Sequence, residues 1–138
     1  MKLRPWLDRG ELQKVEVTEK SLQDILNIIT RDLKDCQLTE LSDDRRFATA
    51  YGAALNIANY VIRKKGYRVS AKIGHHKVTL EVAEIILGND ASMLLNFFDF
   101  CRRKRNKVDY DQAEVVTTTE VDELIKNVLA FKTLALNK

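Results

Sequence analysis

Proline and glycine are scarce in this 138-residue sequence, which has one proline and five glycines, about 4% of the chain, where average proteins have roughly 12%. So few breakers argue against a turn-rich sandwich or barrel and against a long disordered tail. Apolar residues make up 45% of the chain and charged residues 31%, which is enough for a buried core with solvated outer faces. The composition predicts a single, mostly helical domain.

Cysteine is also rare: only Cys36 and Cys101 occur, far apart and outside any Cys-x-x-Cys pattern. Together with the adjacent histidines His75 and His76 they lack zinc-ligand spacing, so we expect free thiols, no metal ion and no cofactor. No stretch approaches the roughly 18 uninterrupted apolar residues of a membrane span, and the charged N-terminus does not resemble a signal peptide. We therefore expect a cytoplasmic protein with no membrane partner.

Apolar residues recur at helical spacing through most of the chain. We expect an N-terminal arm over residues 1–17 with at most a short helix, and a bundle domain over residues 18–138. Thr18 or Ser21 would cap the first bundle helix, and Thr118 or Thr119 the last, whose inner face would include Leu129. Short connections favour antiparallel neighbours, so the fold class is all-α, an up-and-down bundle of four to five helices. The expected helices span about 18–35, 42–65, 75–87, 89 or 90 to 109–112, and 118 or 119 to 136.

Positive charge is concentrated in the middle of the chain. Residues 51–110 carry 11 basic and 5 acidic groups, a net of +6, whereas residues 1–50 have a net of −1 and residues 111–138 a net of −2. One basic focus surrounds the loop 67–74, and the other ends the fourth helix. Both foci lie near helix ends, where cations also stabilise the helix dipole. They can therefore be solvated caps or a patch that binds a polyanion such as RNA.

Arg105 lies on the continuation of the apolar stripe of the fourth helix. A buried arginine needs a partner, because an unpaired buried charge costs several kcal/mol. Asp109, four residues further on, is within reach of an intrahelical ion pair. The alternative is an arginine held at a surface to bind phosphate, for which its planar, permanently charged guanidinium is suited.

Residues 98–111 contain Arg105-Asn106, two residues, and then Asp109-Tyr110-Asp111. This stretch resembles the motif of the HEPN superfamily, in particular the bacterial and archaeal branch that reads Arg-Asn, two residues, Asp-Tyr-Asp. The alanine-rich segment 46–55 and the loop 65–76 resemble the corresponding parts of that family. The likeness extends over about residues 20–135.

The resemblance implies a helical bundle that forms a homodimer, with its motif at the subunit interface. It also implies a metal-independent ribonuclease, often a toxin encoded beside a nucleotidyltransferase-like antitoxin. By the same resemblance, Arg105, Asn106, Asp109 and Tyr110 are the candidate catalytic residues. The candidate substrate-binding residues, which would contact RNA or another phosphate-bearing ligand, are Arg68, His75, His76, Arg102, Arg103 and Lys107.

In the family pattern four to six residues separate the arginine from a histidine, and here Tyr110 follows Arg105 after four intervening residues. A phenol with a pKa near 10 is a poor general base at neutral pH, unlike an imidazole with a pKa near 6.5. His75 or His76, at an expected helix N-terminus that favours phosphate, could supply the missing imidazole. The other possibility is that one histidine caps the helix while the other packs against a tyrosine.

Three readings therefore remain open from the sequence. The first is a HEPN-like RNA-binding protein or ribonuclease of a toxin–antitoxin system. The second is a non-catalytic dimeric helical module that binds a partner protein, nucleotide or polyanion. The third is a purely structural role for Arg105 and Asp109.

Overall fold

The computed structural model describes residues 2–110 and 115–138, the side chains of residues 107–110 excepted. These residues form six α-helices, one 3-10 turn and two short strands. The all-α fold class is therefore confirmed. In chain order the elements are α1 (Arg4–Asp8), β1 (Leu12–Lys14), α2 (Glu19–Asp35), α3 (Asp43–Lys64), β2 (Tyr67–Val69), α4 (His75–Leu87), η1 (Asn89–Ala91), α5 (Ser92–Tyr110) and α6 (Thr118–Leu136).

Local capping chemistry sets where the helices begin. The Thr18 hydroxyl accepts from the Ser21 backbone N–H at 3.1 Å and starts α2, as expected. Helix α6 begins one residue earlier than expected, because Thr117 and Glu120 form a reciprocal capping box that satisfies two otherwise unpaired backbone donors. Helix α5 begins at Ser92, later than expected, because residues 89–91 form a 3-10 turn.

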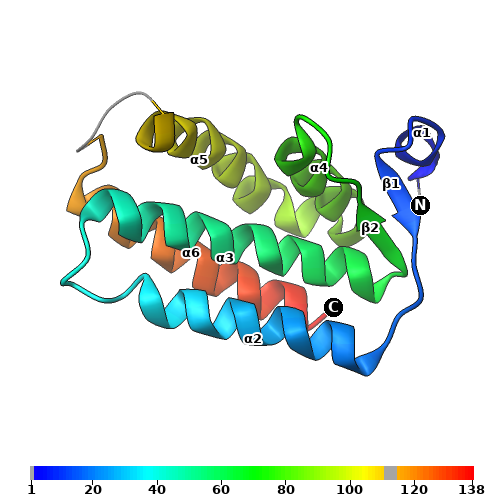
Figure 1. Ribbon diagram of the computed structural model, residues 1–138, viewed down its shortest axis with the longest axis horizontal. Coiled ribbons are helices and arrows are strands. Elements are labelled where there is room, and N and C mark those ends of the chain that lie inside the picture. The colour runs from blue at the N-terminus through cyan, green and yellow to red at the C-terminus, as the bar shows by residue number, and fades with distance from the viewer. Residues whose placement is uncertain (1, 111–114) are drawn as a thin grey trace.

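Helix α3 is the centre of the bundle and contacts α2, α4, α5 and α6 (Figure 1). Its alanines make this possible, because small side chains let neighbouring helices approach closely; Ala50, Ala53, Ala54 and Ala58 are fully buried. On the far side of the core Phe98 of α5 packs against Phe131 of α6, with ring centroids 5.2 Å apart. One continuous apolar core therefore holds the bundle together.

Two features differ from the sequence expectations. Strand β1 pairs antiparallel with β2, placing Leu12 opposite Val69; three-residue strands are too short to show a readable alternation. The expectation that Leu129 lies on the inner face of α6 is wrong, because its side chain is 44% exposed. A rotation of about 100° per residue carries it past the stripe of buried Val128.

No described helix has the length and apolar character to span a bilayer.

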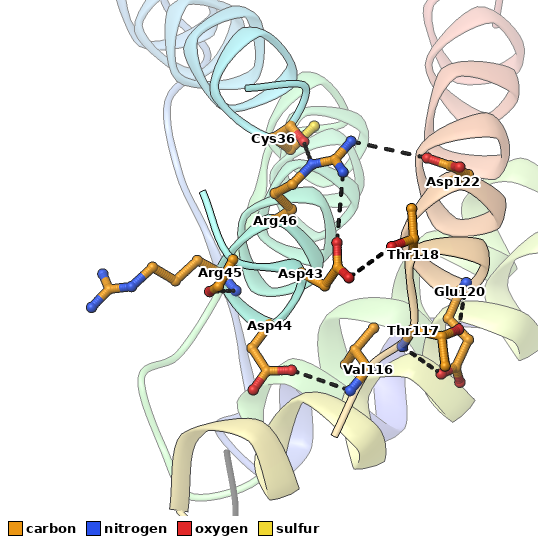
Figure 2. A network of polar contacts seen from close by, with 11 residues as sticks. Cys36, Asp43, Asp44, Arg45, Arg46, Val116, Thr117, Thr118, Glu120 and Asp122 are labelled. Atoms are coloured by element: carbon orange, nitrogen blue, oxygen red, sulfur yellow. Dashed lines mark hydrogen bonds and ion pairs between the residues drawn. The ribbon is translucent and has the colours of Figure 1, made fainter. Parts of the chain in front are cut away.

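The buried Arg46 ties three parts of the chain together at one end of the bundle (Figure 2). Its side chain is 10% exposed, and its Nε donates to the Cys36 carbonyl oxygen at 2.9 Å. The guanidinium also lies 3.7 Å from an oxygen of Asp43 and 3.9 Å from one of Asp122. The end of α2, the start of α3 and the first turns of α6 thus share one cation.

Two further contacts join α3 to the segment that leads into α6. The Val116 backbone N–H donates to Asp44 at 3.1 Å, and the Thr118 hydroxyl donates to Asp43 at 2.8 Å. Figure 2 shows both bonds, with Thr118 meeting the Asp43 carboxylate that also faces Arg46, and Val116 meeting Asp44 further along. We call Arg46, Cys36, Asp43 and Asp122, with these two contacts, the Arg46 network.

Candidate anion-binding site around Tyr51

Tyr51 lies in the middle of α3 and is almost completely buried, with 1% of its surface exposed. Its hydroxyl has no hydrogen-bond partner among the residues that the structure describes. Burial raises the pKa of the phenol well above its ordinary value, and the nearby Arg102 and Arg105 only partly oppose this. The hydroxyl is therefore neutral at physiological pH and can still donate one hydrogen bond.

Two arginines of α5 lie near this ring. The guanidinium carbon of Arg105 is 6.0 Å from the Tyr51 ring centroid, a distance at which a cation is attracted to the face of an aromatic ring. Arg102 is one helical turn earlier, so it lies on the same side of α5. Its Nε donates to Asp99 at 3.0 Å, which holds the guanidinium in place.

His76, in the first turn of α4, completes the arrangement. Its ring centroid is 6.0 Å from that of Tyr51 and 4.4 Å from that of His75. Burial, together with repulsion of the charged form by His75, Arg105 and Arg102, lowers the pKa of His76 to about 4. The imidazole is therefore neutral at pH 7 and can accept a proton.

We call these five residues the Tyr51 cluster: Tyr51, His76, Asp99, Arg102 and Arg105. They come from three helices, α3, α4 and α5, and therefore depend on the packing of the bundle. The cluster combines two permanent positive charges with one carboxylate, a neutral imidazole and a buried hydroxyl. Groups of this kind can bind a phosphate and accept a proton from a neighbouring hydroxyl.

The structure divides the predicted basic run of α5 between two sides of the helix. Arg102 and Arg105 belong to the Tyr51 cluster, whereas Arg103 is exposed and lines a different hollow of about 340 Å³ with Phe100, Lys104 and Val115. Lys104 is also paired with Glu120 of α6. Asn106 is exposed.

Other predicted site residues lie elsewhere or outside the described residues. Arg68 is exposed on β2 and, together with His75, lines a separate cavity between α3 and α4. His75 is oriented by a 2.9 Å hydrogen bond from its Nδ1 to the Lys72 carbonyl oxygen. The side chains of Lys107, Asp109 and Tyr110 lie outside the described residues, and so does the expected Arg105–Asp109 pair.

The sequence pattern does not identify Tyr51 and Asp99 as candidate site residues. Tyr51 follows the apolar stripe of an alanine-rich helix, so its periodicity indicates only a core position. The available signal was its hydroxyl, because a tyrosine at the centre of a helical core needs a partner for its O–H. Asp99 is three residues before Arg102, a spacing that predicts an ion pair on any helix.

Within the described part of the chain, no group of three or more His, Cys, Asp and Glu side chains could hold a metal ion. Cys36 and Cys101 are buried and unbridged. Burial, with Glu123 and Glu120 nearby, raises the pKa of Cys101 to about 12, so its thiol is protonated and unreactive at neutral pH.

Comparison with known proteins adds no assignment to this geometry. No family model matches the chain, and no curated protein or solved structure matches it. The function is therefore inferred from the chemistry of the Tyr51 cluster and from the sequence motif that contributes Arg105.

Proposed function

We propose that the chain binds RNA at the Tyr51 cluster and cleaves it without a metal ion, as a HEPN-like ribonuclease. The observation that carries this proposal is the position of His76, on the same tyrosine ring as Arg105. The sequence motif has Tyr110 where the family has a histidine, and His76 supplies an imidazole from another helix. Arginine and imidazole are the two groups that this chemistry requires.

The proposed reaction uses the groups as the structure holds them. Neutral His76 accepts the proton of an RNA 2′-hydroxyl while the 2′-oxygen attacks the adjacent phosphorus and the 5′-oxygen leaves with a proton from solvent. Arg102 and Arg105 stabilise the negative charge that develops on the phosphate oxygens. A bound phosphate also offsets the repulsion by which the two arginines lower the pKa of His76, so the imidazole becomes a stronger base when RNA is bound.

A second candidate is binding without cleavage, by a non-catalytic helical module. It is favoured by the low pKa of His76, about 4, since the best general base has a pKa near the working pH. In this case Arg102, Arg105 and the Tyr51 hydroxyl bind a phosphate or another polyanion, and His76 only packs against the ring. Such binding would weaken steeply with added salt.

An exposed apolar face on α5 supports the proposal of a homodimer. Met93 is 86% exposed and Phe100 is 54% exposed, and half-buried Phe97 lies between them at helical spacing. Apolar side chains that recur in this way on a helix surface are typical of protein interfaces. A nucleotidyltransferase-like antitoxin remains the proposed partner that the family resemblance implies, and co-purification with such a protein would test it.

The ribonuclease proposal is tested with the purified chain, total RNA and EDTA. We expect wild-type protein to cleave RNA, and Arg105→Gln and His76→Gln each to lower the rate by about 100-fold or more. Arg45→Gln is the matched control, since Arg45 is an exposed arginine in the first turn of α3 and is not a member of the Tyr51 cluster, and it should retain the wild-type rate.

The outcomes separate the two candidates. Salt-sensitive RNA binding that Arg105→Gln weakens, with no cleavage by wild-type protein, would favour the binding module. Cleavage that survives both substitutions, or a wild-type protein that neither binds nor cleaves RNA, would overturn the role of the Tyr51 cluster.

A further inference from the structure

A cavity lies between α2, α3, β2 and the start of α4, and His75 is part of its lining. Its volume is about 230 Å³, and its polar lining includes Asn56, Asn59, Arg63, Arg68 and His75. We call it the Arg63 cavity. None of the Tyr51 cluster residues lines it, so it is a separate site even though His75 touches His76.

The Arg63 cavity has a strongly positive lining. It includes two arginines, and none of its lining residues in the described chain is an aspartate or glutamate. Neither Arg63 nor Arg68 forms an ion pair or a side-chain hydrogen bond with another residue that the structure describes. Arg46, by contrast, lies within 4 Å of two carboxylates.

Arg63 is the unusual member of this lining. Its side chain is half-buried, and its Nε is shielded from solvent without a hydrogen-bond partner among the described residues. A guanidinium N–H that is removed from water and left unpaired is costly. A small rotation of the side chain on binding would let that N–H donate to an anion in the cavity.

The remaining lining indicates the size and kind of the anion. The amides of Asn56 and Asn59 interact only weakly with each other, at 3.5 Å, so they keep donor capacity for a ligand. Apolar side chains of α2, α3 and β2 complete the wall. At about 230 Å³ the cavity is smaller than a typical drug-sized site, and it suits an anionic head on a short carbon body.

We propose that the Arg63 cavity binds a small phosphomonoester as its dianion. Two guanidinium groups in a cavity whose described lining has no acidic residue match a double negative charge better than the single charge of a carboxylate or of an RNA phosphodiester. Arg63 and Arg68 bind the phosphate oxygens, Asn56 and Asn59 donate to the same head group, and the apolar wall contacts the carbon body.

The test is a titration of the full-length protein, followed by backbone amide NMR at pH 7.5, with inorganic phosphate and with glycerol 3-phosphate. Acetate at equal ionic strength is the monoanion control. We expect saturable shifts at residues 56–69, with tighter binding of glycerol 3-phosphate than of inorganic phosphate. Arg68→Gln and Arg63→Gln should each weaken binding by about tenfold, whereas Arg45→Gln should not.

Arg68 is exposed, so Arg68→Gln tests the proposal even if Arg63→Gln fails to fold. Persistence of the shifts in Arg105→Gln would show that the ligand does not occupy the Tyr51 cluster. Equal binding of acetate, shifts confined to residues of the Tyr51 cluster, or affinity unchanged in Arg68→Gln would overturn the proposal.

Discussion

Arg46 and Tyr51 are both buried on α3, yet the polar groups around them differ greatly. Arg46 gives its Nε–H to a carbonyl oxygen and lies beside Asp43 and Asp122. Tyr51 keeps its hydroxyl without a partner in the described chain and has Arg102 and Arg105 beside it. The first environment pairs a buried charge with a carbonyl oxygen and two carboxylates, whereas the second places a buried hydroxyl with no described partner beside two arginines and one carboxylate. Burying a hydroxyl without a partner lowers the stability of the fold, and unfavourable arrangements of this kind are typical of binding and catalytic sites.

Replacing one arginine from each region with methionine tests this difference most directly. We expect Arg46→Met to lower the free energy of unfolding by about 3 kcal/mol, because it leaves the Cys36 carbonyl and two carboxylates without their cation. Arg105→Met, at a half-exposed position, should cost no more than about 1 kcal/mol. Urea denaturation followed by circular dichroism measures both values. A loss of several kcal/mol for Arg105→Met would instead indicate the purely structural role.

The depressed pKa of His76 gives the second prediction. His76 titrates near 4 in the folded protein and near 6.5 when unfolded, so both states are neutral above pH 6.5. Between pH 6.5 and 4 only the unfolded state gains the proton, and stability is lost as the pH falls. Because this half-buried group is partly screened by solvent, we expect its pKa shift to lower the free energy of unfolding by only about 1–2 kcal/mol over this pH range.

The measurement is the free energy of unfolding from pH 7.5 to 4 for wild-type protein and for His76→Gln. The groups that face this imidazole are His75 of α4, Tyr51 of α3, and Arg102 and Arg105 of α5. The variant should lose about 1–2 kcal/mol less over that range, because it removes the titrating group. Identical pH dependence of the two proteins would mean that the imidazole is not shielded as the structure describes.

The smallest expected effect on stability is that of replacing Tyr51. Tyr51→Phe removes the hydroxyl and keeps the ring, so it should raise the free energy of unfolding by about 1 kcal/mol, the cost of burying an unpaired polar group. The same variant should bind RNA less tightly if the hydroxyl contacts a phosphate. Thermal unfolding and an RNA-binding assay on one preparation check both directions. A clear loss of stability would indicate a hydrogen bond to Tyr51.

Much of the fold can be predicted from short stretches of the sequence. Thr18 and Ser42 cap their helices through a hydroxyl three residues before the amide that donates to it. Gly66 ends α3 with a φ of +92°, a backbone conformation that glycine adopts at little cost. The strands β1 and β2 were missed because their pairing joins distant, short segments, and the polar partners of Arg46 were missed for the same reason.

The candidate site was readable in part. Arg102, Arg105 and His76 were named from charge, spacing and resemblance, but nothing local indicates that one tyrosine ring lies near both His76 and Arg105. The periodicity of α3 predicts that Tyr51 is buried but gives no sign that its hydroxyl has no partner among the described residues. The resemblance of the loop 65–76 to the family groups Arg68 and His75 with Arg105, whereas in space the two residues line the Arg63 cavity.

Capping, glycine stops and apolar periodicity act within a few residues, and they are therefore enough to set the helical character of the chain, most helix ends and the buried stripes. The tertiary structure decided which charges meet. It placed two carboxylates around Arg46, brought both His76 and Arg105 to the ring of Tyr51, and placed Arg63 in a cavity whose described lining contains no acidic residue. These differences depend on how α3 packs against its neighbours, because the balance between pairing a charge and removing it from water is set by groups that are distant in the chain.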